Sequence, residues 1–451
     1  MRTYATALTL GLLTAGTTLA QQPMSHHDMQ IMPDVVQVVP DMAVNSAGIS
    51  LAELQSMAIG NNPTLRQAAA LVEAERGAAL QAGLGPNPYV GYVAEQIGVN
   101  GTAGEFQGAS IQQEIVRGNK LGLSRDKYAQ RAKIAETNFS AQQQRVLNDV
   151  AMRFYETYAA QQRIDIQQQT IDIANDNVLT TKEMLNMGQV GEADVLKAEV
   201  ELRRATVSLK QAINQQDKAW RELASFVGIP TVQPTMLLDE VDSQQLPLDW
   251  DVALSNLINT SPQVIAAQQK VCHDRIMVQR EVAEPIPNLL LGVSTGYNAE
   301  ANQAVAGVTV GMYLPVFNRN QGTIRQARAD LSLACAELER LQLDLRNQLA
   351  KQYSDYLTAW QRVQEYDETM LPKSRKAVDM LEQSYRDRRA PWISVLDAKQ
   401  FLLSLEAEQI DNRLAYRTAD VAIRGNLLIG GLTIPDVPAS GGHIDANNQP
   451  R

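Results

Sequence analysis

The chain has 451 residues, of which only 5% are aromatic, and its formal net charge at pH 7 is −10. Few large aromatic side chains, with Ala, Leu, Gln and charged residues dominating, are typical of long helices rather than of a compact globular core. The negative charge excludes nucleic acid from the expected partners, because no basic surface would neutralise phosphates.

The N-terminus predicts a cleaved secretory signal peptide over residues 1–20. Met1 and Arg2 precede an apolar run, residues 5–20, which ends in small residues before Gln21. This run is too short for a membrane-spanning helix, which needs about 20 residues. We therefore expect the protein to be exported.

The segment after the signal, residues 21–50, is expected to be a flexible extension with metal-binding side chains. Five of them lie close together, namely Met24, His26, His27, Met29 and Met32. Thioether and imidazole ligands suit Cu(I), and imidazole also suits Cu(II), Zn²⁺ and Ni²⁺. Two interpretations stay open: a weak metal site, or a tail that contains His and Met incidentally.

The rest of the chain repeats itself at a nearly constant spacing. Pro63 and Pro262 stand 199 residues apart, and so do Asn119 and Asn318. A spacing held over such a length predicts two copies of one unit. The expected boundaries are residues 51–230 for the first unit, 231–249 for a linker, 250–430 for the second unit and 431–451 for a partly disordered tail.

Each unit has the same predicted order of elements. A first helix, near residues 51–84 or 252–282, ends at a pair of prolines. Two strand-like runs follow, and then a very long helix, a turn and a helix that runs back. The long helix of the first unit, from about residue 120 to 188, would measure roughly 100 Å at ~1.5 Å per residue.

Apolar residues recur every seven positions along the long helices and the helices that run back. Ala198, Ala205 and Ala212 are one such series. This spacing predicts left-handed packing of the coiled-coil type, and the small side chains predict a close approach between helices.

The strand-like runs alternate between apolar residues and small or polar ones. In residues 288–297, Val293 stands between Gly292 and Ser294, and residues 306–314 repeat the pattern. This alternation is typical of membrane β-barrel strands, although an ordinary surface hairpin is the alternative for each run alone. Four strands cannot close a barrel, so we expect several chains to pool their strands, and three copies would supply twelve.

This organisation resembles that of the TolC-like outer-membrane efflux proteins over about residues 51–430. The resemblance rests on the proline-bounded hairpins and on two turns. Residues 188–199, GQVGEADVLKAE, resemble the first periplasmic tip turn of that family, and residues 385–398, YRDRRAPWISVLDA, resemble the second. It implies a mainly helical chain with two long antiparallel hairpins and four membrane strands. Three chains would form a 12-stranded β-barrel continuous with an α-helical periplasmic tunnel.

The resemblance also implies roles for residues of the tips, which would converge to close the tunnel. Asp397 matches a constriction acid, Asp194 would make a gate hydrogen bond or salt link, and Tyr385 matches a gate tyrosine. The chain departs from the family at Ser394, where a second acid is common, and at Arg388, where the family has Gly. The alternative for both acids is a helix N-terminal charge, worth ~0.3–1 kcal/mol. The residues assigned to the turns themselves are Gly188, Gly191, Arg388, Arg389 and Pro391.

The function implied by the resemblance is passive conduction across the outer membrane. A periplasmic adaptor and an inner-membrane pump of the resistance–nodulation–division (RND) type would dock at the tips and supply the energy, and no cofactor is implied. The Met- and His-containing extension favours the metal-exporting branch, with copper, silver, zinc or cobalt ions as cargo. Multidrug efflux and type I secretion are alternatives within the family. A non-conducting periplasmic coiled-coil scaffold is the alternative of another class.

Nothing in the sequence predicts catalysis. His273 stands beside Cys272 without a partner motif, and no GxxxxGK, HExxH or CxxC pattern appears. The chain has two cysteines, Cys272 and Cys335, which occupy positions typical of small apolar helix residues. We expect two free, buried thiols rather than a disulfide.

Overall fold

The computed structural model describes residues 48–98, 105–231, 233–238 and 247–438. These residues lie in one unit of the chain, Ala47–Arg451. In chain order the elements are β1 (Ile49–Ser50), α1 (Leu51–Asn61), α2 (Pro63–Ala82), β2 (Tyr89–Glu95), β3 (Phe106–Ile115), α3 (Lys120–Asn186), α4 (Glu192–Val227), β4 (Leu237–Leu238), α5 (Trp250–Thr260), α6 (Pro262–Ala283), β5 (Leu289–Asn298), β6 (Gln303–Gly311), α7 (Gln321–Glu365), the π-helical segment η2 (Tyr366–Met370), α8 (Leu371–Arg386) and α9 (Trp392–Arg424).

Some predictions fall outside the described residues. These are the signal peptide, nearly all of the extension and the end of the C-terminal tail. The same holds for the five predicted metal-binding residues, Met24, His26, His27, Met29 and Met32.

Each unit begins with two helices where the sequence predicts one. Helix α1 ends before Asn62, whose extended backbone (φ −67°, ψ 123°) precedes Pro63 at the start of α2. Helix α5 ends in the same way before Ser261 (φ −61°, ψ 122°), ahead of Pro262. A proline disfavours the α conformation in the residue before it, so the helix breaks at that point. The Asn62 side chain accepts a hydrogen bond from the Thr64 N–H and caps the new helix.

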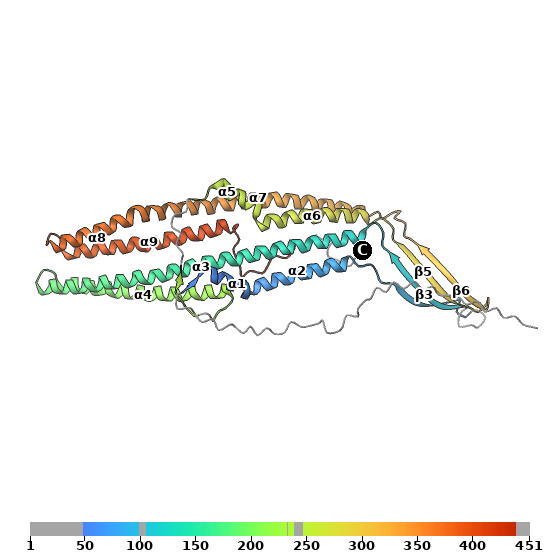
Figure 1. Ribbon diagram of the computed structural model, residues 1–451, viewed down its shortest axis with the longest axis horizontal. Helices are drawn as coiled ribbons and strands as arrows, with labels where there is room; N and C mark the ends of the chain where they lie inside the picture. The colour runs from blue at the N-terminus through green and yellow to red at the C-terminus, as the bar shows by residue number, and fades with distance from the viewer. Residues whose placement is uncertain (1–47, 99–104, 232, 239–246, 439–451) are drawn as a thin grey trace, which may run out of the picture. The chain divides into compact units, whose positions relative to one another are not determined.

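Two long antiparallel helical hairpins make up most of the structure (Figure 1). Helix α3 runs without interruption for 67 residues and pairs with α4. In the second hairpin, α7 and α8 are separated by η2, and both pack on α9. The sequence analysis did not predict this interruption. Its physical cause is Pro372 in the first turn of α8, which cannot donate the backbone hydrogen bond of a regular α-helix.

The start of each long helix has the same conformation. Asn119 (φ 55°) precedes α3, and Asn320 (φ 58°) precedes α7, both in the left-handed region. By conformation the structure therefore matches Asn119 with Asn320, and not with Asn318 as the constant spacing suggested. The two units differ slightly in length at this junction.

The apolar core is divided among the helices. One cluster around Phe154 and Leu223 joins α1, α3 and α4, and another around Tyr356 joins α5, α7 and α9. A third packs Ile166 of α3 against Ile410 of α9 and so joins the two hairpins. Burying each such large side chain contributes roughly 1.5–3 kcal/mol. In the described ranges, no helix is both long enough and apolar enough to cross a bilayer.

The seven-residue series of α4 faces its partner helix. Ala198, Ala205 and Ala212 are all buried, as their spacing predicts. Small side chains at these positions let the backbones of α3 and α4 approach each other closely.

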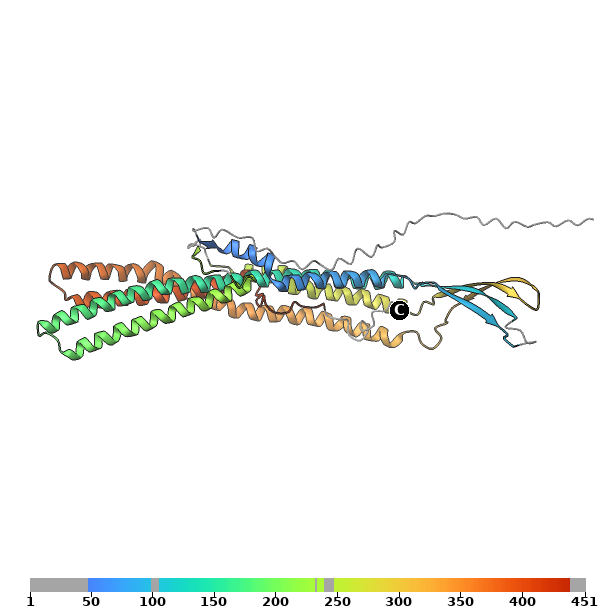
Figure 2. The same ribbon diagram turned by 90° about the horizontal axis from the view of Figure 1, so that it is seen from below.

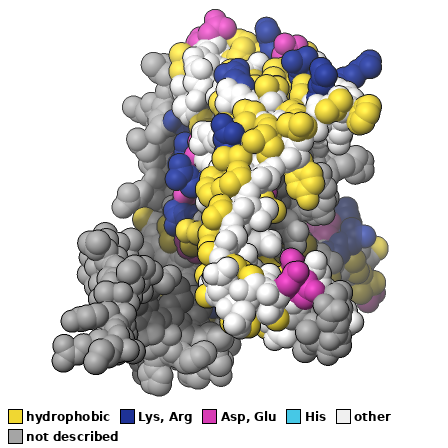
Figure 3. All heavy atoms as spheres, turned by 90° about the vertical axis from the view of Figure 1, so that its right-hand side faces the viewer, with side chains coloured by type: hydrophobic (Ala, Val, Ile, Leu, Met, Phe, Trp, Pro, Cys, Tyr) yellow, Lys and Arg dark blue, Asp and Glu magenta, His cyan; other side chains and the backbone are white. Residues whose placement is uncertain are grey.

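Four strands form one antiparallel sheet in the order β2-β3-β5-β6, so β3 of the first unit pairs with β5 of the second. The register places apolar residues of all four strands in one row across the sheet: Val90, Ile111, Val293 and Val308. The next row consists of Gly91, Ser110, Ser294 and Gly307. Successive residues of a strand point to opposite faces, so the apolar row and the row of Gly and Ser lie on opposite faces of the sheet. The register confirms the predicted alternation in these two rows. Figure 3, which looks at the sheet end, shows hydrophobic side chains in yellow among white backbone and polar side chains, with charged side chains beside them.

Within the pairing of β3 with β5, two glycines face each other. Gly108 stands opposite Gly296. A Cβ on Gly296 would lie 2.7 Å from the Gly108 Cα and closer still to the carbonyl oxygen of Gln107. Both positions therefore require Gly, because no side chain fits between the two backbones.

The chain after α9 folds back onto α3 through buried polar side chains of that helix. The Asn148 amide donates to the carbonyl oxygen of Gly425 (2.9 Å). One carboxylate oxygen of Asp149 accepts from the N–H groups of Gly430 (3.0 Å) and Gly431 (2.6 Å). Burial raises the pKa of the Asp149 carboxyl, and these two N–H donors oppose the rise. Side chains of α3 thus satisfy backbone groups that no regular element pairs.

The two cysteines are free, as predicted, but the prediction that they are buried is wrong. Cys272 on α6 and Cys335 on α7 are both exposed. Each of these helices buries only a narrow stripe of its surface. A small apolar residue can therefore lie on the exposed side of the helix as well as on the buried side.

Replacing Gly296 by Ala is expected to lower the free energy of unfolding by about 1–3 kcal/mol, because the new methyl group overpacks the contact with β3. The measurement is the thermal unfolding midpoint of the detergent-purified protein. Gly311→Ala is the matched control on the adjacent strand, since nothing lies within 4 Å of its Cβ position. Equal stability of the two variants would contradict the assignment.

Candidate functional site

Both tip turns lie at the end of the helical hairpins farthest from the sheet, one between α3 and α4 and the other between α8 and α9 (Figures 1 and 2). They carry the residues to which the sequence analysis assigned a gate. A second candidate site lies at the opposite end of the helices, where they meet the strands.

The first turn closes α3 with a glycine in the left-handed conformation. Gly188 has φ +69°, and its N–H donates to the carbonyl oxygen of Leu185 (2.9 Å). The N–H of Gln189 reaches back to Met184 (2.9 Å). These two bonds satisfy carbonyl groups that the end of a helix leaves unpaired.

The second turn repeats this geometry with an arginine in place of glycine. Arg388 has φ +57°, and its N–H donates to Tyr385 (2.9 Å). The N–H of Arg389 reaches back to Ser384 (2.7 Å). A left-handed residue with a Cβ costs roughly 1–2 kcal/mol relative to glycine, so the second tip is the more strained of the two.

The acid of the first tip bonds to the start of its own helix. One carboxylate oxygen of Asp194 accepts from the N–H of Gly191 (3.0 Å), which caps α4. The corresponding position in the second tip is Ser394, whose N–H donates to the carbonyl oxygen of Pro391 (3.2 Å). Proline has no N–H to offer, so a carboxylate at this position would have no capping donor. An Asp in place of Ser394 would therefore lack the capping bond that Asp194 makes.

Tyr385 lies against an aromatic residue that the sequence analysis did not single out. Its ring centroid is 4.8 Å from that of Trp392, at the start of α9. The Lys399 ammonium lies over the Trp392 ring, 5.4 Å from its centroid, and pairs with Glu382 (2.8 Å). This lysine lowers the pKa of the Glu382 carboxyl. The sequence signal for this contact was a Trp directly after the proline that precedes α9, because a side chain at that position packs against the preceding helix α8.

The remaining predicted residues of the tip are not drawn into one cluster. Asp397 is exposed, and no ion pair joins it to any residue in the described part of the chain. Arg389 pairs with Asp387 beside it. The structure therefore brings Tyr385 and Arg388 together through the backbone of the turn, and it leaves Asp194 and Asp397 apart from that contact.

The second candidate site, the junction pocket, lies between the helices and the two connections to the strands. It has a volume of about 720 Å³. It is lined by β3, by the first turns of α3 and α7, by the end of α6 and by the connections on either side of the second strand pair. Its lining residues include Glu114, Lys120, Ser124, Lys127, Arg280, Glu281, Glu284, Asn288, Tyr313 and Phe317.

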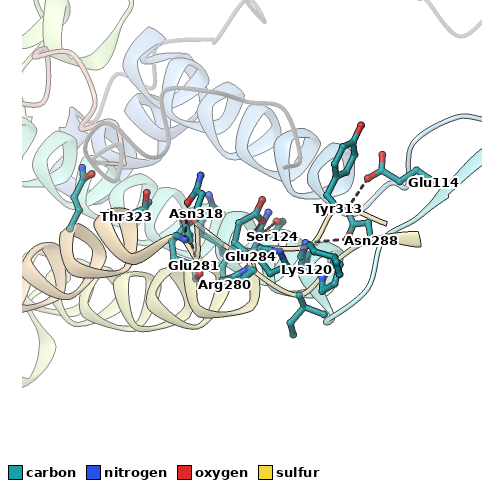
Figure 4. Close-up of a pocket in the computed structure, with 18 of the residues that line it drawn as sticks. Glu114, Lys120, Ser124, Arg280, Glu281, Glu284, Asn288, Tyr313, Asn318 and Thr323 are labelled. Carbon is teal, nitrogen blue, oxygen red and sulfur yellow. Dashed lines mark hydrogen bonds and ion pairs between the residues drawn. The ribbon is translucent and has the colours of Figure 1, made fainter. Parts of the chain in front are cut away.

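Figure 4 shows how Asn288 links two charges in the junction pocket. Its amide oxygen accepts from the Lys120 ammonium (3.1 Å), and its amide nitrogen donates to the Glu114 carboxylate (2.8 Å). Deeper in the pocket, Arg280 donates to Ser124 (2.9 Å) and pairs with Glu284 (2.5 Å).

The charges of the pocket are unevenly compensated. Lys120 is only 4% exposed, and the side chain to which it donates, that of Asn288, is a neutral amide. Burial accordingly lowers the pKa of the Lys120 ammonium, although Glu284 and Glu114 oppose the fall. The sequence analysis missed this site, because its residues come from both units.

In the described residues, no group of three or more His, Cys, Asp or Glu side chains is placed to hold a metal ion. His273 is fully buried, and its Nδ1 lies 2.8 Å from the carboxylate of Asp274.

Replacing Arg388 by Gly is expected to stabilise the second tip by about 1 kcal/mol, because glycine adopts a positive φ without strain. Slower amide hydrogen exchange in peptides that span residues 384–392 is the measurement. Arg389→Gly is the matched control, since Arg389 is not among the described residues with positive φ. Faster exchange in Arg388→Gly than in the parent would show that the turn is held by the arginine side chain instead.

Comparison with known proteins identifies the family. A family model described as "Outer membrane efflux protein" matches residues 54–229 and again residues 253–427. The cobalt-zinc-cadmium resistance protein CzcC of Cupriavidus metallidurans is 23% identical over 369 residues, which cover 81% of this chain and 87% of that protein. The pyoverdine export outer membrane protein OpmQ of Pseudomonas putida is 26% identical over 270 residues, which cover 56% of each.

The fold agrees with this assignment. The solved structure of CusC superposes with a TM-score of 0.69 at 15% identity, covering 84% of this chain and 92% of that one. At such an identity the likeness speaks for the fold alone, which is that of a TolC-like channel. Because the family model covers most of the chain, the expectation of an outer-membrane location and of a non-enzymatic role is confirmed. The chain belongs to the outer membrane efflux protein family.

Proposed function

We propose that the protein is the outer-membrane channel of a tripartite efflux system and that its cargo is a heavy-metal cation. The similarity to CzcC, whose name records cobalt, zinc and cadmium resistance, supports the choice of cargo. The Met24, His26, His27, Met29 and Met32 group supports it independently, since thioether and imidazole are ligands for such ions.

The observation that carries the channel is the apolar row across the four strands. Val90, Ile111, Val293 and Val308 are exposed or only partly covered in the single chain, and they lie on one face. Lipid is the environment that such a face requires, with the small row turned toward a lumen. A non-conducting periplasmic scaffold would have no use for it.

Closure of the sheet requires further copies of the chain. Strands β2 and β6 are the edges of the four-stranded sheet, and an unpaired edge cannot be left in hydrocarbon. Three copies would join β6 of one chain to β2 of the next and give a 12-stranded barrel. The helical hairpins of the homotrimer would then continue the barrel as a tunnel in the periplasm.

Conduction through such a tunnel is passive, and the tips are the natural place to control it. A periplasmic adaptor and an inner-membrane RND pump would engage the tips and supply the energy. Asp194, Tyr385, Ser394 and Asp397 remain our candidates for the constriction, with Arg388 and Arg389 in the adjoining turn. The capping bond of Asp194 in the single chain is compatible with this role, because one of its carboxylate oxygens is left for a neighbouring helix.

A second cargo is favoured by one observation. OpmQ, which is similar over 270 residues, is named for pyoverdine export, so export of an organic molecule is the competing proposal. The same channel architecture would serve both cargoes, as it would serve multidrug efflux or type I secretion.

Deletion of the gene is expected to make the cells sensitive to cobalt, zinc, copper or silver salts, because the channel removes these ions. The measurement is growth across metal concentrations beside a panel of organic toxins, with a plasmid-borne copy as the control. Sensitivity to the organic toxins alone would contradict a metal cargo while leaving the channel intact.

Replacing Asp397 by Ala, or Asp194 by Ala, is expected to raise the single-channel conductance in planar bilayers, because an acid that narrows the resting tip is removed. Asp387→Ala is the matched control at the same tip, since Asp387 already pairs with Arg389. Conductance that stays at the parent value, or that rises equally in the control, would count against the gate.

A further inference from the structure

We infer that helix α7 of one chain packs against helix α2 of the next chain, in the register in which α3 packs against α6 within a chain. This contact would place Cys335 opposite Ala70 of the next chain. The inference rests on the proposed homotrimer, and it adds the residues through which the helical parts of neighbouring chains meet.

The helices next to the sheet are arranged in the order of their strands. Helix α2 packs on α3, α3 on α6 and α6 on α7, so the order α2-α3-α6-α7 repeats the strand order β2-β3-β5-β6 (Figure 1). Helices α2 and α7 are the two ends of this order, as β2 and β6 are the edges of the sheet. Helix α7 follows β6 in the chain, and α2 precedes β2. Pairing of β6 with β2 of the next chain therefore brings α7 and α2 side by side.

The contact between α3 and α6 shows how such a pair of helices packs. The carbonyl oxygen of Gln269 on α6 accepts from the Gln130 amide of α3 (3.5 Å), and its side-chain oxygen accepts from the Thr137 hydroxyl (2.9 Å). Nearer the sheet, Arg280 of α6 donates to the hydroxyl of Ser124 on α3 (2.9 Å). The two helices run in opposite directions, because α3 leaves the sheet and α6 returns to it. Helix α7 and α2 of the next chain have the same relation.

The internal repeat transfers this register to the two end helices. Asn119 corresponds by conformation to Asn320, 201 residues later, and Pro63 corresponds to Pro262, 199 residues later. A residue of α3 is therefore matched by the residue 201 positions later in α7. A residue of α6 is matched by the residue 199 positions earlier in α2.

The matched pair at the centre of the contact is Cys335 and Ala70. Ile134 lies midway between the two α3 residues that bond to Gln269, on the same face of the helix, and is only 5% exposed. Its counterpart on α7 is Cys335, and the counterpart of Gln269 on α2 is Ala70. Both counterparts are exposed in the single chain.

The matched pair nearer the sheet exchanges its chemistry between the two helices. Ser124 and Arg280 are 5% and 3% exposed. Their counterparts, Arg325 on α7 and Gln81 on α2, are both exposed. The arginine thus comes from the other helix of the pair, but it still faces a side chain that can accept its hydrogen bond. A partner helix covers these positions within the chain, and we expect the next chain to cover their counterparts.

The test is crosslinking of the detergent-purified full-length protein, after light scattering has established its oligomeric state. Ala70→Cys supplies a thiol opposite the native Cys335. A bis-maleimide with a short linker is expected to convert the monomer band on denaturing gels into covalent dimers and trimers, because each interface joins two chains. The parent protein is expected to stay monomeric on the same gels, since its Cys335 side chains lie in three separate interfaces.

Ala69→Cys is the matched control. Ala69 is exposed beside Ala70, but its counterpart on α6, Gln268, stays exposed even where α3 is packed against that helix. A thiol at this position should therefore point away from the next chain and give no covalent oligomer. Combining Ala70→Cys with Cys335→Ser should abolish the crosslink as well.

A charge exchange tests the register by a second measurement. Gln81→Arg places two arginines opposite each other across the interface, and it should lower the temperature at which the trimer dissociates, because like charges repel. Adding Arg325→Ser reproduces the pair that Ser124 and Arg280 form within the chain, and it should restore that temperature. Arg325→Ser alone is the control for loss of the arginine.

The outcomes separate this interface from the channel itself. A trimer in which the variants at positions 69 and 70 crosslink equally, or in which neither does, would overturn the inference and leave the proposed channel standing. A crosslinked product of monomer mass would also overturn it, because the two thiols would then meet within one chain. Failure of Arg325→Ser to rescue Gln81→Arg would contradict the register. A protein that is monomeric before crosslinking would overturn the inference together with the homotrimer.

Discussion

The pairing of β3 with β5 is the interaction on which the arrangement of the two units depends. It joins them over ten residue pairs, from Phe106 opposite Asn298 to Ile115 opposite Leu289. A slip by one residue would turn the apolar row of one unit to the opposite face of the sheet. Gly108 and Gly296 help to exclude such a slip, because only two glycines facing each other tolerate this approach of the backbones. The register in turn sets where α3 begins after β3 and where α6 ends before β5.

The two hairpins end in turns of the same conformation, but the helices that lead to these turns differ. Helix α3 is continuous, whereas the second hairpin widens into η2 before Pro372. Helix α9 packs against η2 and contacts it through polar side chains. Arg413 pairs with Asp367 (2.8 Å), and the Tyr366 hydroxyl donates to Glu408. These side chains offset part of the disruption that the proline introduces, so the interruption is specified by two helices rather than by one.

The junction between strands and helices joins a sheet with an exposed apolar row to the long helices. Glycine, proline and asparagine change the backbone direction there, and charged side chains become buried as a result. Arg280 is matched by Glu284 within its own helix end. Lys120, at the first position of α3, donates to an amide from the other unit.

The sequence by itself determined the strand pairs, the long helices and their order, because each rests on local periodicity. It did not predict the breaks at Asn62, Ser261 and η2. Alternation along residues 288–297 and 306–314 is a property of the strands alone, and the alanine series of α4 is a property of one helix. The family resemblance followed from the two tip turns. The roles assigned to Asp194, Tyr385, Ser394 and Asp397 stay predictions, since a constriction requires neighbouring chains that one sequence does not place.

Tertiary structure decided what depends on partners distant in the chain. The exposure of Cys272 and Cys335 depends on which stripe of each helix is covered, and local spacing does not determine that. The cap on Asp194 depends on whether the residue before the helix has an N–H, which Gly191 has and Pro391 lacks. The junction pocket combines residues from both units. Burial and charge pairing depend on contacts between segments that are distant in sequence, and a local sequence pattern does not specify those contacts.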